Sequence, residues 1–176
     1  MILQKERTGL EKKLFDLSQK VVTDQNLKLY DLDYLQSSGI LRVFIIDEKT
    51  DTALLDDCVR VDHAFSPYFE SEDWIPENIT LQVSSPGIYR KLTSLEHFKA
   101  SVGKRVKLIF LKALGETVKD APKKLQGAKI VTADVLDVTD EAISLKEGDF
   151  NFSVNFSDIK KANLDVNLFS ELRKES

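Results

Sequence analysis

The sequence predicts an α+β protein of 176 residues, in which a two-layer α/β domain of order αββαβ precedes a small antiparallel β domain. Helical periodicity dominates part of the first half, whereas the second half is patterned almost entirely as short strands. Hydrophobic residues make up 42% of the chain, which is enough to bury a core. We therefore place one domain at residues 1–92 and the other at residues 93–176.

The first half begins with a helix and a hairpin. Leucines and a valine recur at helical spacing over residues 7–23, which predicts an amphipathic helix. Strict alternation over residues 30–34 predicts a half-buried strand, and the β-branched run at 40–46 predicts its partner. Ser37-Ser38-Gly39 between them has the composition of a turn.

A second helix is predicted over residues 55–69, with Cys58 on its apolar stripe. A nucleophilic thiol needs exposure and a nearby base, but His63 lies about 140° round the helix from Cys58. We therefore expect Cys58 to be a buried structural residue. Alternation over residues 79–84 then predicts a third strand, which Ser85-Pro86-Gly87 ends.

Short strands dominate the second half. Thr93-Ser94-Leu95-Glu96 has the form of a capping box, with Thr93 as the N-cap of a short helix. The strand patterns that follow cover residues 105–112, 129–138, 141–146, 150–156 and 159–164. Their number and hairpin spacing predict a small barrel or sandwich. The polar, lysine-rich residues 113–128 are expected to form an extended loop, either functional or simply mobile.

Charge is distributed unevenly along the chain. Residues 1–92 carry 11 Lys or Arg and 16 Asp or Glu, whereas residues 93–176 carry 14 and 13. Between residues 99 and 129, nine basic residues face only two acidic ones, which favours local contact with phosphate. The competing interpretation is a solvated strand and loop with ordinary surface lysines. An overall charge of −4 argues against indiscriminate coating of nucleic acid.

No catalytic residue, metal site or cofactor is predicted. One cysteine and two histidines provide no metal-binding cluster, and no Gly-rich phosphate loop occurs. The paired aspartates, Asp31 with Asp33 and Asp56 with Asp57, have spacings that do not require acid–base catalysis. No apolar run approaches the ~20 residues of a membrane span, and no secretory signal is evident. We expect a cytoplasmic, monomeric binding protein rather than an enzyme.

Several short segments form a specific set of motifs. The most specific is LQVSSPGIYRKL at residues 81–92, followed by EHF at 96–98 and VGKRVK at 102–107. Further motifs are LRVFI at 41–45, LDDC at 55–58 and FSDIKKA at 156–162. Together these motifs resemble the bacterial ribosome maturation factor RimP family, and the matches occur in order over roughly residues 10–168.

The sequence departs from the family pattern at four places, one of which is Gln82 in place of an acidic residue. Leu54 stands where the family favours a helix-capping Thr, so the second helix lacks a side-chain N-cap worth typically ~1 kcal/mol. Tyr89 and Lys91 replace the usual Asp and Pro around Arg90. Residues 113–128 form a longer connection than the family usually has there.

The resemblance implies an Sm- or SH3-like barrel as the second domain and a non-enzymatic role in ribosome biogenesis. It implies that the protein binds the immature 30S subunit and promotes its maturation. The implied partners are 16S rRNA and a basic ribosomal protein of the decoding region, small-subunit protein twelve. An acidic N-terminal domain would complement such a basic protein. The alternative function is that of an Sm-like RNA-binding module acting as an RNA chaperone or regulator.

Two groups of residues are predicted to form the binding site. The resemblance carries over Ser84, Ser85, Pro86, Gly87 and Arg90 as a contact or interdomain surface, although a strand end and a linker need such residues for structure alone. Lys104, Arg105 and Lys107 begin the first strand of the predicted barrel. Alternation places Arg105 and Lys107 on its solvent face, where they would meet rRNA phosphate.

Overall fold

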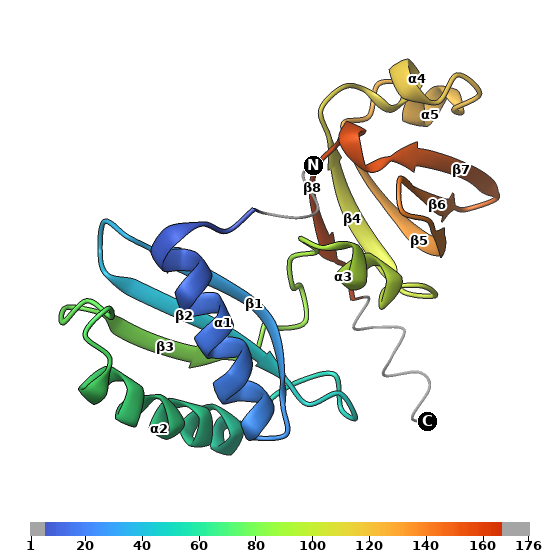
Figure 1. Cartoon of the computed structure of the whole chain (residues 1–176). Coiled ribbons are helices and arrows are strands. Elements are labelled where there is room, and N and C mark those ends of the chain that lie inside the picture. The colour runs from blue at the N-terminus through green and yellow to red at the C-terminus, as the bar shows by residue number, and fades with distance from the viewer. Residues whose placement is uncertain (1–5, 167–176) are drawn as a thin grey trace. The chain divides into compact units, whose positions relative to one another are not determined.

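The computed structural model describes residues 6–166 and divides into two compact units (Figure 1). The first unit comprises residues 6–87, and the second unit begins at Ile88. The first combines helices with a small sheet and the second is built on an antiparallel sheet, so the predicted α+β class is confirmed. The ends of the two predicted domains, residues 1–5 and 167–176, lie outside the described residues.

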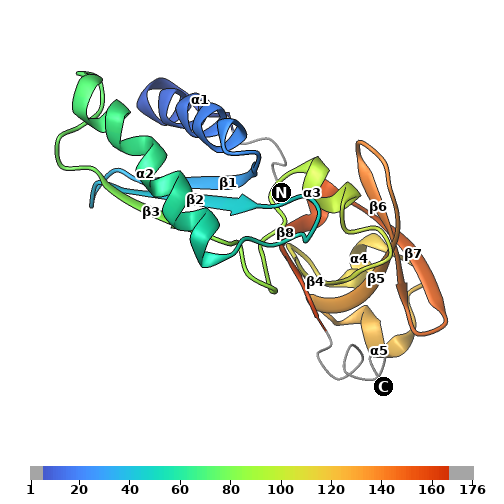
Figure 2. The same ribbon diagram turned by 90° about the horizontal axis from the view of Figure 1, so that it is seen from below.

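The first unit has the predicted αββαβ order. Its elements are α1 (Gly9–Asp24), β1 (Lys28–Leu35), β2 (Ile40–Ile46), α2 (Leu55–Ser71) and β3 (Thr80–Ser84). β1 and β2 form an antiparallel hairpin, and β3 joins β2 in parallel on its other side. Figure 2 shows α1 lying over β1 and α2 alongside β3, so the helices supply the second layer.

One face of the first sheet is buried beneath the helices and the other is open. Leu41, Val43 and Ile45 of β2 point into the helix-covered core, where none of them is exposed to solvent. The side chains that alternate with them belong to the open face. There Arg42 Nε donates a 3.0 Å hydrogen bond to Gln82 Oε1 on the neighbouring β3. The strand pattern that alternation predicted therefore follows from one-sided burial.

The second unit contains one five-stranded antiparallel sheet of order β7-β6-β5-β4-β8. Its main elements are α3 (Leu95–Lys99), β4 (Arg105–Phe110), β5 (Ile130–Val138), β6 (Ala142–Glu147), β7 (Phe150–Asn155), the 3-10 helix η1 (Phe156–Asp158) and β8 (Ile159–Leu164). Val106 and Leu108 of β4 are fully buried in the core of this unit, as the alternation of the strand required.

Over residues 88–166 the second unit is an open sheet, so the Sm- or SH3-like barrel that the resemblance implied is not closed. Within the described residues, the edge strands β7 and β8 are not hydrogen-bonded to each other, so the sheet stays open. Only the three residues of η1 connect these strands, and they carry the chain from one edge to the other. Phe152 of β7 and Ile159 of β8 nevertheless belong to the same core cluster. Both edge strands therefore contribute side chains to one core without a closed ladder of hydrogen bonds.

The segment 113–128 is ordered, in contrast to the extended loop that was predicted. It contains two single-turn helices, α4 (Leu114–Thr117) and α5 (Lys123–Gln126). Leu114 has no exposed surface and Ala121 is also buried, and both pack into the second core. A methyl group on Gly115 would come within 3.0 Å of the Gln126 backbone, so α4 and α5 are in close contact. The segment is thus a packed insertion that displays lysines.

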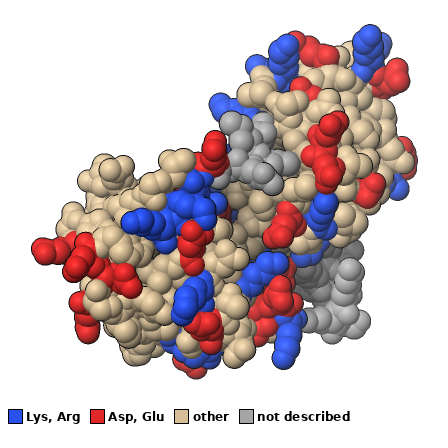
Figure 3. All heavy atoms as spheres, viewed as in Figure 1, with Lys and Arg blue, Asp and Glu red and all other residues tan. Residues whose placement is uncertain are grey.

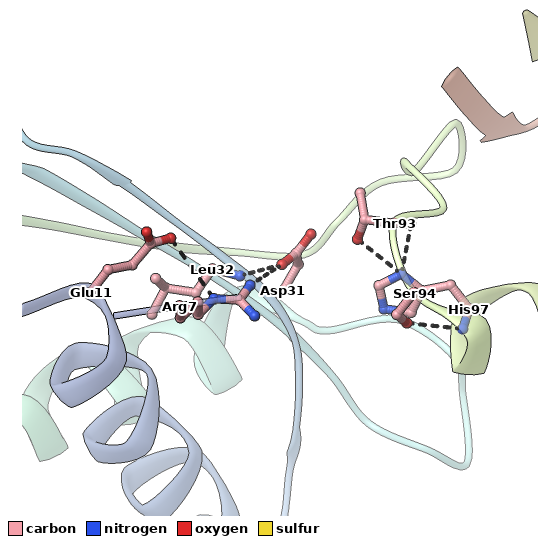
Figure 4. A network of polar contacts seen from close by, with 7 residues as sticks. All are labelled: Arg7, Glu11, Asp31, Leu32, Thr93, Ser94 and His97. Atoms are coloured by element: carbon pink, nitrogen blue, oxygen red, sulfur yellow. Dashed lines mark hydrogen bonds and ion pairs between the residues drawn. The ribbon is translucent and has the colours of Figure 1, made fainter. Parts of the chain in front are cut away.

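The N-cap of α3 is Ser94 and not the predicted Thr93. Ser94 Oγ accepts a 3.2 Å hydrogen bond from the backbone N–H of His97, three residues on (Figure 4). The Thr93 backbone N–H in turn donates to Nδ1 of His97 at 3.1 Å. His97 therefore takes the position expected for Glu96, because the cap lies one residue later in the sequence.

The residues between the two sheets belong to the second unit from Ile88 onward. Leu92 is buried in the second core, and its backbone N–H donates to Ala162 of β8 at 3.0 Å. Whether residues 1–92 and 93–176 fold as separate domains stays a prediction. None of the helices between residues 6 and 166 is long and apolar enough to cross a membrane.

Candidate functional site

The Ser-Pro-Gly turn closes β3 through contacts of its own. Ser84 is the last residue of β3, exposed and paired in register with Phe44 of β2. Ser85 Oγ accepts a 3.1 Å hydrogen bond from the backbone N–H of Gly87. Gly87 has φ = +78°, a left-handed conformation that glycine adopts without strain. With Pro86 half-buried between them, this geometry accounts for the motif as a turn, and its role in partner binding stays a prediction.

Cys58 lies next to this turn inside the first unit. It is half-buried rather than fully buried, and it packs against the first core. Burial raises the pKa of the Cys58 thiol above its ordinary value of 9.0, and the negative charge of Asp57 adds to this effect. A hydrogen bond from the Ser85 backbone opposes the shift. The thiol is therefore protonated near neutral pH. Its hydrogen bond with the Ser85 backbone connects α2 to the residue that follows β3.

Arg90 is a buried residue of the second unit. It is only 8% exposed, and its backbone carbonyl accepts a 3.0 Å hydrogen bond from Leu164 of β8. Buried arginines are rare unless their charge is satisfied within the protein. This position supports a structural role for Arg90 more than direct contact with a partner.

The three predicted cations at β4 have different environments. Lys104 is exposed but precedes the strand, in the turn that follows α3, so the prediction that it begins the strand is wrong. Arg105 and Lys107 occupy alternate positions on the outer face of the sheet, opposite the buried Val106. The structure thus brings Arg105 and Lys107 onto one face, as predicted.

Arg105 is already paired within the second unit. Its guanidinium lies 3.2 Å from Glu147 and 3.4 Å from Asp134, and it also donates to the carbonyl of Thr132. Pairs this exposed contribute little to stability, about 0–1 kcal/mol each. They do cancel the positive charge that a phosphate would meet. Arg105 is therefore a weaker candidate for phosphate contact than its position in the sequence indicated.

Lys107 is exposed, and within the part of the chain described its side chain makes no hydrogen bond or ion pair. It pairs in register with Asn163 of β8, and Ile109 pairs with Lys161. Lys161 is consequently a diagonal neighbour of Lys107 on the same face of the sheet. Diagonal neighbours of this kind are typically about 7–8 Å apart. We call Lys107 and Lys161 the lysine pair of the outer face. Sequence reasoning missed Lys161 because its position depends on the pairing of β8 with β4.

The two units differ in net charge. Residues 6–87 contain 8 Lys or Arg and 16 Asp or Glu, a net charge of −8, whereas residues 88–166 contain 14 and 11, a net charge of +3. On the face in Figure 3, acidic and basic side chains are interspersed, with a group of acidic side chains at the left edge of the first unit. The second unit therefore offers individual cations on that face rather than a continuous basic surface.

One aspartate of each predicted pair has a structural partner. Asp31 Oδ1 accepts a 3.0 Å hydrogen bond from the Arg7 guanidinium and a 2.8 Å bond from the Leu32 backbone (Figure 4). Asp57 accepts bonds from Arg60 and from the Leu54 backbone. Among residues 6–166, no group of three or more His, Cys, Asp or Glu side chains is placed to hold a metal ion.

A comparison with known families identifies the first unit. Residues 17–89 match the family model described as the RimP N-terminal domain. The match includes β1, β2, α2 and β3 together with the Ser-Pro-Gly turn. This match confirms the resemblance inferred from the sequence motifs for residues 17–89.

Proposed function

We propose that this chain, whose residues 17–89 match the RimP N-terminal domain, is a ribosome maturation factor that binds the immature small ribosomal subunit. The family match over residues 17–89 carries this proposal. The family is one of non-enzymatic assembly factors, so the proposed activity is binding rather than catalysis.

Within this proposal, the first unit binds a basic ribosomal protein of the decoding region. Its net charge of −8 is complementary to such a protein. Electrostatic complementarity of this kind sets the encounter rate and orientation more than the affinity. A factor that must leave once the subunit is mature benefits from such moderate, salt-dependent binding.

The second unit is proposed to contact 16S rRNA. The lysine pair of the outer face, Lys107 and Lys161, and the exposed Lys104 can each approach a phosphate. The lysines of the insertion, Lys119, Lys123 and Lys124, are exposed on a packed scaffold and add to this set. Ordered cations lose less conformational freedom on binding than cations on a mobile loop.

Sedimentation of a cell lysate through a sucrose gradient tests the proposed function. A maturation factor should migrate with free small subunits and accumulate on particles from cells with stalled assembly. An RNA chaperone or regulator should instead remain in light fractions and shift when RNase is added. Absence of the protein from the small-subunit fractions at low salt would overturn the proposal.

A further inference from the structure

The beginning of α2 exposes three apolar side chains. Leu54, Leu55 and Val59 are 69%, 78% and 46% exposed, and we refer to them as the α2 apolar face. Leu55 and Val59 are four residues apart in the helix and therefore adjacent on its surface. Leu54 precedes them at the N-cap. Single exposed leucines are common, but here two exposed apolar side chains, Leu55 and Val59, are adjacent on one side of the helix, and exposed Leu54 directly precedes Leu55.

Leu54 also occupies a position where it weakens the helix. The N-cap of α2 has no side-chain hydrogen bond, because leucine offers no acceptor for the first backbone N–H groups. Only the reciprocal bond forms, from the Leu54 backbone N–H to Asp57 Oδ2 at 3.0 Å. An exposed leucine that contributes neither a cap nor core burial has no stabilising role within the described structure.

The surroundings of the α2 apolar face are acidic. Asp56 and Asp62 are exposed, and within residues 6–166 neither forms an ion pair. The nearest cation on the helix, Arg60, is held by Asp57 at 2.9 Å. Asp62 follows Val59 by three residues, so it lies on the same side of the helix. A ligand of this face would meet apolar contact flanked by uncompensated negative charge.

We propose that the α2 apolar face binds a basic protein segment that places an apolar side chain against Leu55 and Val59 and its Lys or Arg side chains near Asp56 and Asp62. Nucleic acid does not fit, because its phosphates would face the same carboxylates. A second copy of this chain would bring the two sets of carboxylates together, which is unfavourable. The inference rests on the proposed function, in which the basic segment belongs to a small-subunit ribosomal protein.

The test compares two matched double variants of the full chain. Leu55→Ala with Val59→Ala removes the patch without changing charge, and both positions are exposed, so the fold should persist. Val102→Ala with Leu136→Ala removes two side chains of the second unit that are 48% and 44% exposed. Binding of purified small-subunit protein twelve is measured by calorimetry at physiological salt, and co-sedimentation of the wild-type chain with small subunits is measured separately.

We expect the α2 double variant to raise the Kd for the basic protein at least about 10-fold, as for a central apolar anchor, and the control to change it by less than about twofold. Asp62→Asn should weaken binding less and flatten its salt dependence, whereas Asp73→Asn, also exposed in the first unit, should not.

If the two double variants bind the basic protein with equal affinity, the inference is overturned. The proposed function still stands in that case, provided that the wild-type chain co-sediments with small subunits. If the wild-type chain does not co-sediment, the proposed function fails and the calorimetry alone decides the inference. Failure of the wild-type chain to bind the basic protein would also overturn the inference. So would a dimer in analytical ultracentrifugation that the α2 double variant abolishes, because the occupant would then be a second copy.

Discussion

The two units of this chain bury their cores differently and carry opposite charge. The first lays two helices on one face of a three-stranded sheet, whereas the second curls a five-stranded sheet around its own apolar side chains. Residues 6–87 have a net charge of −8 and residues 88–166 a net charge of +3. The proposed function accordingly assigns the acidic first unit to a basic protein and the second unit to rRNA.

The comparison also shows that residue type alone does not decide which charges are available. Arg105 and Lys107 lie on the same face of β4, but Arg105 is paired with Asp134 and Glu147. Lys107 has no such partner within the described residues. The second unit therefore presents fewer unpaired cations than its sequence contains. Strand register decides which of them are left unpaired and able to meet a phosphate.

The largest expected effect concerns the insertion in the second unit. Leu114→Ala should lower the free energy of unfolding by about 2–5 kcal/mol, because it leaves a cavity in the second core. Leu111→Ala, at an exposed position three residues earlier, should change it by less than about 0.5 kcal/mol. Urea denaturation of the full chain measures both. Equal effects would show that residues 113–128 are a loop after all.

Substitutions at the N-caps of α3 and α2 should change the stability of their units in opposite directions. Ser94→Ala removes the hydroxyl that caps α3 and should destabilise the second unit by about 1 kcal/mol. Leu54→Ser supplies the missing cap of α2 and should stabilise the first unit by a similar amount. Thermal denaturation measures the two shifts. A destabilised Leu54→Ser variant would mean that Leu54 makes contacts that its exposure conceals.

Substitution of Cys58 should change stability only weakly, and its thiol should react slowly. Cys58→Ser should cost on the order of 1 kcal/mol, the low end of the range for an apolar site that receives a hydroxyl, because the site is only half-buried. Alkylation of the native thiol by iodoacetamide at pH 8 should be slower than that of a free cysteine peptide. Rapid alkylation would contradict the protected environment beside Ser85.

The raised pKa of Cys58 also predicts how stability depends on pH. The folded state holds the thiol proton more tightly than the unfolded state, so this contribution to stability is complete below about pH 9. It is lost as the pH rises further. Relative to Cys58→Ala, the wild-type chain should therefore lose stability as the pH rises above about 9, measured by urea denaturation. Parallel curves for the two proteins would exclude the effect.

Elements with strong local patterns could be predicted from the sequence. The β-branched run at Ile40–Ile46 and the short strand at Ile159–Leu164 have the predicted bounds. The helices of the insertion were missed because four residues are too few for periodicity to appear. Thr93 and Ser94 are adjacent and both able to cap, so the sequence pattern could not distinguish them.

The candidate site was less predictable because it depends on long-range contacts. The partners of Arg105 are 29 and 42 residues away in the chain and meet it only through the pairing of β4, β5 and β6. Lys161 reaches Lys107 only because β8 pairs with β4. Open edges of the second sheet likewise follow from tertiary packing, which no local pattern specifies.

The central claim is that the first unit binds a basic protein and the second binds rRNA. Its most direct test is the salt dependence of small-subunit binding by a Lys107→Gln, Lys161→Gln double variant. If both lysines contact rRNA phosphate, the log–log salt dependence of small-subunit binding should flatten by roughly 0.7–0.9 for each. Arg105→Gln should change it less, because Asp134 and Glu147 already neutralise that charge. Binding of the isolated basic ribosomal protein should be unchanged in both variants. An unaltered salt dependence in the double variant would contradict the account and leave the outer face of the second unit as an ordinary solvated surface.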